Sequence, residues 1–149
     1  MVIREIPVAE TRPLRHRILR PHESIDQLIS HEPPDAFAVG AFDGGDRLVA
    51  VGFVGRDGEP GAWRVRGMAT EPEARGRGAG NAVLAALLDH AAGAGAARVW
   101  CNARVRASSL YKRSGFKVAT EEFDLPQIGP HLVMEWRPGG GQATSTMDA

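Results

Sequence analysis

The sequence predicts one α/β domain of the mixed α+β kind, with a sheet of about six to seven strands and about four helices. Three observations lead to this fold class. The length of 149 residues suits one domain with a single core and leaves no room for a second catalytic domain. Short alternating or apolar runs of strand length recur along the chain. A glycine-rich turn separates one of these runs from a longer segment with helical spacing.

The first part of the chain predicts a strand, two short helices and a hairpin. Val2–Ile6 alternates in the manner of a strand. A helix is expected to open at Pro13 and run up to Pro21, and Ser24 with Gln27 forms a capping box for a second helix. The runs 36–42 and 48–54 then flank a turn with two glycines, which is typical of a β-hairpin.

The second part is organised around a glycine-rich segment at 75–80. The run 63–70 alternates apolar residues with arginines and predicts a strand leading into that segment. Apolar residues at helical spacing follow it, and Gly93 and Gly95 end the helix. The remaining expected elements are a strand at 97–103, a helix at 107–114, a strand at 116–122, a loop at 123–130 and a last strand at 131–137. We expect the domain to span 1–137 and the tail 138–149 to be disordered.

Composition argues against some classes of function and indicates the cellular compartment. The 18 basic and 18 acidic residues balance, so no overall charge draws the protein to nucleic acid or to an anionic membrane. The single cysteine cannot form an internal disulfide, no signal peptide is evident at 1–7, and no apolar stretch approaches membrane-helix length. We therefore expect a cytoplasmic protein. Abundant Arg, Ala and Gly suggest a bacterial source with a GC-rich genome.

The segment 75–80 predicts an anion site. A glycine-rich turn between a strand and a helix presents free backbone N–H groups at the positive end of the helix dipole. Its three glycines let a phosphate approach the backbone, and Arg75 and Arg77 add positive charge. No Gly-Lys-Ser/Thr follows, and the glycine spacing does not fit a dinucleotide fingerprint. A coenzyme A pyrophosphate is the ligand that remains.

Two blocks of the sequence resemble the GNAT N-acetyltransferases. Residues 68–80 are similar to motif A of that family, with its defining positions at Arg75, Gly78 and Gly80. Residues 107–116 are similar to its motif B, an alanine followed by a tyrosine and a Gly-Phe pair at the familiar intervals. The resemblance extends over about 1–137, because the order of predicted elements also matches.

The resemblance implies the GNAT, or acyl-CoA N-acyltransferase, fold, a strongly bent mixed sheet flanked by helices. It also implies direct transfer of an acetyl group from acetyl-CoA to a primary amine in a ternary complex, with no metal required. Within the family, residues 103–104 and 130–134 resemble the ElaA-like branch of small bacterial members. Family members often pair through their last strands or helices, which implies a homodimer as the candidate assembly.

The same resemblance implies which residues hold acetyl-CoA. The strand before motif A is expected to bind the pantetheine arm through its backbone, and one of its N–H groups to polarise the thioester carbonyl. Arg104 stands where many members carry Asn or Gln near the cofactor, and Asn102 could substitute for it. The implied cofactor-binding residues are Met68, Ala69, Thr70, Arg75, Gly76, Arg77, Gly78, Ala79, Gly80, Asn102 and Arg104.

Two residues are predicted to be catalytic. Tyr111 sits where the family places the acid that protonates the departing thiolate, although a packing role is the alternative for any lone tyrosine. A base must accept the proton of the amine, and His131 is the candidate at the start of the last strand. The other candidates by fold are Glu121, Glu122 and Asp124, which also read as a solvated acidic face.

Other polar residues leave alternatives open. Arg12, Arg15, His16, Arg17 and Arg20 follow one another along the first helix, and a charge run is usually a solvated face. If they line the acceptor pocket instead, the acceptor should carry a carboxylate or phosphate besides its amine. Cys101 lies in an apolar strand, so we do not expect acetyl-cysteine chemistry there.

We conclude from the sequence that the protein is an N-acetyltransferase acting on a small-molecule amine. The alternative is a module of the same fold that binds coenzyme A for sensing or assembly without turnover. A third reading, an unrelated α/β domain with a chance glycine-rich turn, predicts no coenzyme A binding. The acceptor, the preferred acyl chain, the base and the oligomeric state are left open by the sequence.

Overall fold

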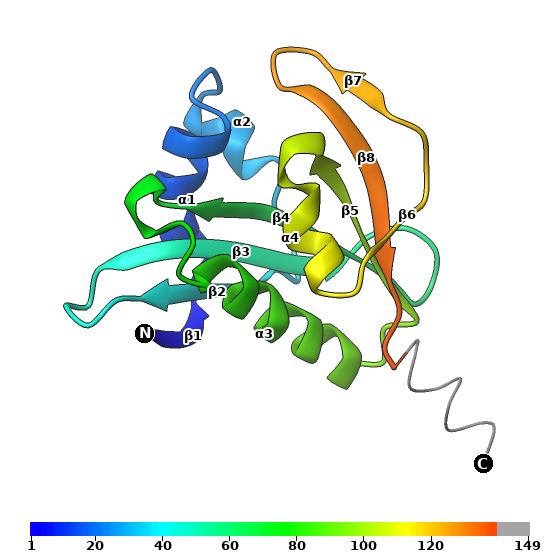
Figure 1. The fold of residues 1–149 in the computed structure, drawn as a ribbon, viewed down its shortest axis with the longest axis horizontal. Coiled ribbons are helices and arrows are strands. Elements are labelled where there is room, and N and C mark those ends of the chain that lie inside the picture. The colour runs from blue at the N-terminus through cyan, green and yellow to red at the C-terminus, as the bar shows by residue number, and fades with distance from the viewer. Residues whose placement is uncertain (140–149) are drawn as a thin grey trace.

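The computed structural model describes residues 1–139, which form a sheet of eight strands with helices on both faces (Figure 1). The strand order is β1-β2-β3-β4-β5-β8-β6, and β7 also pairs with β8. Every pairing is antiparallel except that of β4 with β5, so the sheet is mixed. The strands are β1 (Val2–Ile6), β2 (Phe37–Phe42), β3 (Leu48–Arg56), β4 (Ala62–Thr70), β5 (Arg98–Arg104), β6 (Lys117–Val118), β7 (Phe123–Leu125) and β8 (Gly129–Trp136).

Four α-helices accompany the sheet, together with shorter helical turns. The α-helices are α1 (Arg12–Leu14), α2 (Ile25–Ile29), α3 (Ala79–Gly93) and α4 (Ser108–Arg113). The 3₁₀ turns are η1 (Val8–Thr11), η3 (Pro72–Ala74) and η4 (Val105–Ala107), and η2 (Arg15–Leu19) is a π-helical turn that continues α1. None of the helices within residues 1–139 is long and apolar enough to cross a membrane.

The first four strands form a sheet that is covered on both faces. Helix α3 packs one face with Val83, Leu84 and Leu87, all fully buried in the larger core cluster. Leu14 of α1, with the flanking turns, packs on the opposite face in a second cluster that includes Phe53. Alternate residues of each strand therefore reach different cores, as the period of a β-strand requires.

The sheet opens between β4 and β5. Their parallel pairing joins only Ala62–Arg64 of β4 to residues 98–100 of β5. Beyond this point the two strands run apart, as Figure 1 shows. The pairing of β3 with β4 shifts register in the same region, where Gly67 has φ = +69°. A side chain at Gly67 would come within 2.8 Å of the Phe53 ring, so glycine is needed there for space as well as for conformation.

Most predicted elements are confirmed. Strand β1 has the predicted bounds, the hairpin β2–β3 forms, and Ser24 and Gln27 make the predicted capping box on α2. Helix α3 ends at Gly93, and Gly95 follows with φ = +90°. The bent mixed sheet agrees with the predicted fold class. The tail predicted to be disordered lies, from residue 140 onwards, outside the described residues.

The edge next to β8 differs from the prediction. The strand expected at 116–122 is wrong beyond Lys117–Val118, and the loop expected at 123–130 contains β7. Thr120 explains the interruption, because its hydroxyl accepts a hydrogen bond from the Val133 N–H at 3.0 Å where a backbone carbonyl would otherwise accept. Pairing with β8 resumes at Phe123, opposite His131. A side chain therefore replaces one ladder bond and divides an edge strand in two.

Candidate active site

The glycine-rich segment forms an open turn at the start of α3. Gly76 and Gly78 have φ values of +82° and +81°, and Gly78 is the N-cap residue of α3. An added side chain at either glycine would meet nothing within 4 Å, so the surrounding space is free for a ligand. No side chain caps the first turn of α3. Its free N–H groups and the helix dipole make this turn suited to an anion.

The charged side chains beside this turn are available to a ligand. Arg75 and Arg77 are exposed, and neither makes a salt bridge to a residue of the described chain. Asn81, in the first turn of α3, has a buried Oδ1 that has no hydrogen-bond partner within residues 1–139. An unpartnered buried acceptor is costly, so a ligand donor at this position would stabilise the site.

A groove of about 800 Å³ runs from this turn along the open edge of β4. Its walls are the end of β4, the glycine-rich turn with the start of α3, and residues of η2, η4 and α4 on the other side. Met68, Ala69 and Thr70 line it, as do Arg75, Gly76, Gly78, Ala79 and Gly80. Arg106 and Arg113 add two further arginines, while the lining includes no acidic residue. We call this the outer groove.

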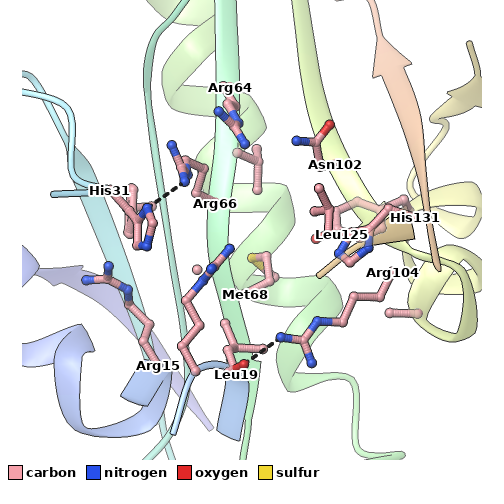
Figure 2. A pocket seen from close by; sticks show the side chains of 16 residues that line it. Arg15, Leu19, His31, Arg64, Arg66, Met68, Asn102, Arg104, Leu125 and His131 are labelled. Atoms are coloured by element: carbon pink, nitrogen blue, oxygen red, sulfur yellow. Dashed lines mark hydrogen bonds between the residues drawn. The ribbon is translucent and has the colours of Figure 1, made fainter. Parts of the chain in front are cut away.

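A second, smaller cavity of about 150 Å³ lies deeper in the opening between β4 and β5. Figure 2 shows its lining, with Arg64 and Arg66 from β4 facing Asn102 and His131 from β5 and β8. Tyr111 also lines it. The outer groove and this inner cavity share four lining residues, Leu19, Met68, Arg104 and Ala107. The groove and the cavity therefore adjoin each other at these residues.

Tyr111 lies in the wall of the inner cavity and not of the outer groove. Its ring packs edge-to-face on Phe116, with ring centroids 5.3 Å apart, and only 7% of the residue is exposed. This burial raises the pKa of Tyr111 well above its usual range. The phenol therefore stays protonated at neutral pH. A packing role and a role as an acid are thus compatible in this residue.

His131 lies buried on the opposite wall of the cavity, paired in register with Arg104 across β5 and β8. Its Nδ1 lies 2.8 Å from the carbonyl oxygen of Gly129. A carbonyl can only accept, so Nδ1 carries the proton and donates it. In the neutral ring the lone pair is then on Nε2, which makes no hydrogen bond within the described part of the chain.

The two residues expected near the cofactor on β5 occupy different places. Arg104 lines both the groove and the cavity, and its Nη2 donates to the carbonyl oxygen of Leu19 at 2.7 Å. It thus holds the end of η2 against β5 across the opening of the sheet. Asn102 lines only the inner cavity and not the outer groove. It therefore lies apart from the glycine-rich turn, where the sequence predicts the phosphates.

Most of the other candidate residues line neither the outer groove nor the inner cavity. Glu121, Glu122 and Asp124 are exposed and line neither cavity. Cys101 is buried, and this burial raises the pKa of its thiol to about 12, which keeps it neutral. Of the charged residues on the first helix, only Arg15 and Arg20 line the inner cavity. The remaining three are Arg12 and Arg17, which pair with Glu32 and Glu71, and His16, which bonds to the Glu23 carbonyl.

Sequence reasoning missed four arginines and one amide, namely Arg64, Arg66, Arg106, Arg113 and Asn81. Arg64 and Arg66 project from β4 into the inner cavity, while their neighbours Trp63 and Val65 point into the core. The alternation of arginines with apolar residues in 63–70 indicated that this strand has a polar face. Nothing in the pattern showed that this face would line a cavity rather than meet solvent. Asn81 and Arg106 were missed because neither stands at a motif position.

Comparisons with known proteins agree with this geometry. Residues 3–116 match the model of the acetyltransferase (GNAT) family. The chain is 37% identical to the uncharacterized N-acetyltransferase YitI of Bacillus subtilis over 139 residues, which cover 89% of this chain and 93% of that protein. Placement in the ElaA-like branch stays a prediction.

Solved structures show the same fold at low sequence identity. An IAA acetyltransferase from Bacillus cereus superposes with a TM-score of 0.72 at 17% identity, covering 91% of this chain and 98% of that one. An aminoglycoside 6'-N-acetyltransferase complexed with coenzyme A also gives a TM-score of 0.72 at 17% identity, covering 92% and 97%. The match of the family model, the YitI relative and the shared fold together show that this chain is an acyltransferase that belongs to the GNAT acetyltransferase family.

Proposed function

We propose that the protein transfers an acetyl group from acetyl-CoA to the primary amine of a small molecule by direct attack. The observation that carries the proposal is that the two spaces adjoin each other at Met68. The outer groove ends at an anion-binding turn, and the inner cavity holds Tyr111 and His131. The groove suits a long phosphorylated substrate, and the small cavity suits a small second substrate.

In this arrangement the pyrophosphate of acetyl-CoA binds the turn at 75–80. Backbone N–H groups of the first turn of α3 and the side chains of Arg75 and Arg77 contact its oxygens. The pantetheine arm follows the end of β4, which has no strand partner on its β5 side after Arg64. Backbone groups there can hydrogen-bond the amides of the arm. The thioester then reaches the shared wall at Met68 and Arg104.

The chemistry requires one proton to be removed and another to be supplied. The neutral amine nitrogen attacks the thioester carbonyl carbon, and a backbone N–H of β4 stabilises the oxyanion. His131 Nε2 accepts a proton from the nitrogen, which becomes positively charged when its bond to the carbonyl carbon has formed. As the carbon–sulfur bond breaks, the electron pair leaves on sulfur, and Tyr111 donates its phenolic proton to the thiolate. Proton exchange with solvent restores both side chains.

The test is a two-stage measurement on the full chain. Isothermal titration of acetyl-CoA should show saturable binding, and release of free thiol in Ellman's assay should depend on an added primary amine. Absence of acetyl-CoA binding would overturn the proposal. Binding without amine-dependent release across a broad amine panel would instead favour the non-catalytic coenzyme A module.

A further inference from the structure

The inner cavity is strongly cationic. Five of its sixteen lining residues are arginines, and none is acidic. They come from three separate parts of the fold, namely η2 and its C-terminal cap, strand β4, and strand β5. These arginines are Arg15, Arg20, Arg64, Arg66 and Arg104. Such a concentration of like charge around a small cavity is unfavourable unless an anion offsets it.

Two of the five arginines are neutralised by carboxylates outside the cavity wall. Arg15 is almost completely buried and pairs with Glu32 at 2.7 Å, and Arg20 pairs with Glu23 at 3.0 Å. Arg64 is only partly satisfied. Its Nη1 lies 3.3 Å from the half-exposed carboxylate of Asp57, while its buried Nε has no partner within residues 1–139. One donor of Arg64 is therefore free beside the cavity.

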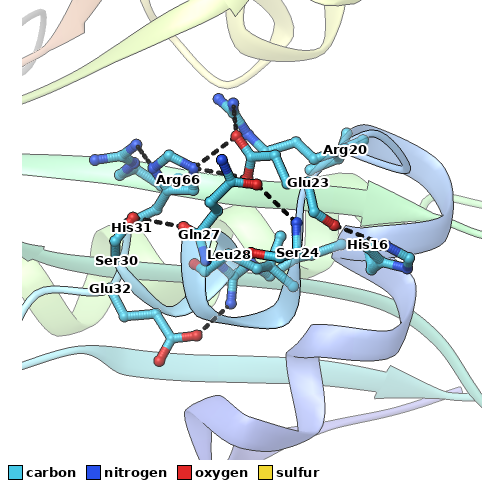
Figure 3. A network of polar contacts seen from close by, with 12 residues as sticks. His16, Arg20, Glu23, Ser24, Gln27, Leu28, Ser30, His31, Glu32 and Arg66 are labelled. Atoms are coloured by element: carbon cyan, nitrogen blue, oxygen red, sulfur yellow. Dashed lines mark hydrogen bonds and ion pairs between the residues drawn. The ribbon is translucent and has the colours of Figure 1, made fainter.

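Arg66 has no carboxylate partner within the described chain. Its Nη2 donates to Nδ1 of His31 at 3.1 Å. Because Nδ1 accepts, His31 carries its proton on Nε2 and donates it to Glu23, 2.9 Å away. Figure 3 shows this relay from Arg66 through His31 to Glu23. The relay orients the guanidinium while a neutral ring separates it from the negative charge.

Arg66 remains charged under physiological conditions. Burial, together with the positive charge of the neighbouring Arg64, lowers its pKa to about 10. At neutral pH the guanidinium is therefore protonated and partly desolvated, and it has no carboxylate partner within residues 1–139. Charged donors in this state bind an oxyanion strongly, and a guanidinium matches the two oxygens of a carboxylate in one plane.

We propose that the acetyl acceptor is an amine that also carries a carboxylate, and that Arg66 with Arg64 binds this carboxylate in the inner cavity. The inference rests on the proposed function and names the acceptor class for that same site. The arginines would serve a second purpose, because nearby positive charge favours the neutral form of the attacking amine. The same charge would exclude polyamines and other purely cationic amines.

The test compares acceptors that differ only in the carboxylate. Thiol release is measured for a panel of amino acids, each matched with its carboxamide, and for phosphoethanolamine as a phosphate-bearing amine. We expect at least one amino acid to exceed its amide in kcat/KM by on the order of 10- to 100-fold. An equal or greater rate for the amides would overturn the proposal. A preference for phosphoethanolamine alone would also overturn it, in favour of a phosphate-bearing acceptor.

Variants of Arg66 test the assignment of the carboxylate site. Arg66→Gln should raise KM for the preferred amino acid about 10-fold or more and leave its amide almost unaffected. Arg66→Lys keeps the charge but loses the planar fork, so its KM for the amino acid should lie between those of the wild type and Arg66→Gln. Arg56→Gln is the matched control, since Arg56 is an exposed arginine on the neighbouring strand β3 that lines neither cavity.

Two further measurements distinguish failure of the proposed acceptor class from failure of the proposed function. Acetyl-CoA should bind the Arg66 variants with unchanged affinity, so loss of acetyl-CoA binding by the wild type would refute the proposed function rather than the acceptor class. If no amine is turned over, the amino acids are titrated into the protein–CoA complex, and absence of saturable binding by all of them overturns the proposal. A role of Arg66 in folding alone predicts a lower Tm for Arg66→Gln, whereas a binding role predicts an equal or higher one.

Discussion

The outer groove and the inner cavity meet at Met68 but are built in different ways. The groove offers mainly backbone: two glycines with positive φ, an uncapped helix start and the unpaired edge of β4. The cavity offers side chains, with arginines, histidines, Asn102 and Tyr111 converging from η2 and its C-terminal cap, the turn after α2, β4, β5, α4 and β8. The glycine-rich turn of the groove is a local feature of one stretch of chain, whereas the cavity is assembled from distant stretches.

This difference indicates which part would bind any coenzyme A thioester and which part would select the amine. Backbone groups at a helix start can bind the phosphates of any coenzyme A thioester, whatever the acceptor. The side chains of the cavity can distinguish one amine from another, because a buried unpaired donor penalises the wrong partner. Substitutions in the cavity should therefore alter catalysis and acceptor choice, while substitutions at the turn should alter only cofactor affinity.

The largest expected effect tests whether the chemistry occurs in the cavity. Tyr111→Phe should lower kcat about 100-fold, the low end of the range for a general acid, with acetyl-CoA affinity unchanged. Steady-state kinetics of thiol release and isothermal titration measure the two quantities. Because burial raises the pKa of Tyr111, the wild-type kcat should show no fall near pH 10, where an ordinary tyrosine would ionise. A change in kcat of less than twofold in the variant would contradict the assignment.

The next effect separates the paired arginine of the cavity from the unpaired one. Arg15→Met should lower the free energy of unfolding by about 2 kcal/mol, because Arg15 bonds both Glu32 and the Leu28 carbonyl in a buried site. The loss is less than for an isolated buried pair, since Arg12 still bonds Glu32. Urea denaturation of this variant beside Arg66→Gln measures the contrast. Equal destabilisation of both variants would mean that Arg66 is also structural.

A smaller effect is expected at the turn. The double variant Arg75→Ala, Arg77→Ala should weaken acetyl-CoA binding about 10-fold, because each exposed guanidinium contributes modestly to phosphate binding. The loss should shrink at high salt, and kcat at saturating acetyl-CoA should not change. Isothermal titration at two ionic strengths provides the measurement, with Arg56→Ala as the control. Unchanged affinity would mean that the phosphates of acetyl-CoA do not bind at this turn.

The smallest effect concerns Cys101, a core residue of strand β5. Burial raises the pKa of its thiol from 9.0 to about 12, so the folded protein holds this proton more tightly than the unfolded chain. The corresponding stability is present below pH 9.0 and is lost as the pH rises towards about 12. Cys101→Ala should flatten this alkaline slope in denaturation experiments. The native thiol should also be inert to Ellman's reagent until denaturant is added.

Features that depend on neighbours in sequence were predictable. The capping box of α2 needs only Ser24 and Gln27, and the anion-binding turn needs only glycines between a strand and an apolar helix. The split of the edge strand was not predictable, because it depends on Thr120 meeting the N–H of Val133 on another strand. Short-range rules fail wherever a side chain from elsewhere replaces a backbone partner.

The candidate site divides along the same line. The sequence assigned residues 75–80 to the cofactor, and all of these except Arg77 line the groove. It also singled out Tyr111 and His131, which the fold brings to one cavity. It could not separate Arg15 and Arg20, which line that cavity, from Arg12 and Arg17, which do not. It also gave no sign of the relay that orients Arg66 through His31.

The sequence by itself determined the fold class, the order of the elements and the glycine-rich turn before α3, because local periodicity, glycine conformation and helix-end chemistry act within a few residues. Only the tertiary structure decided which charged side chains face the cavity and which of them keep a free donor. That choice depends on the divergence of β4 from β5 and on pairings between residues such as Arg15 and Glu32 or Arg66 and His31. Burial and charge compensation are properties of assembled surfaces, so they exist only once distant segments have packed together.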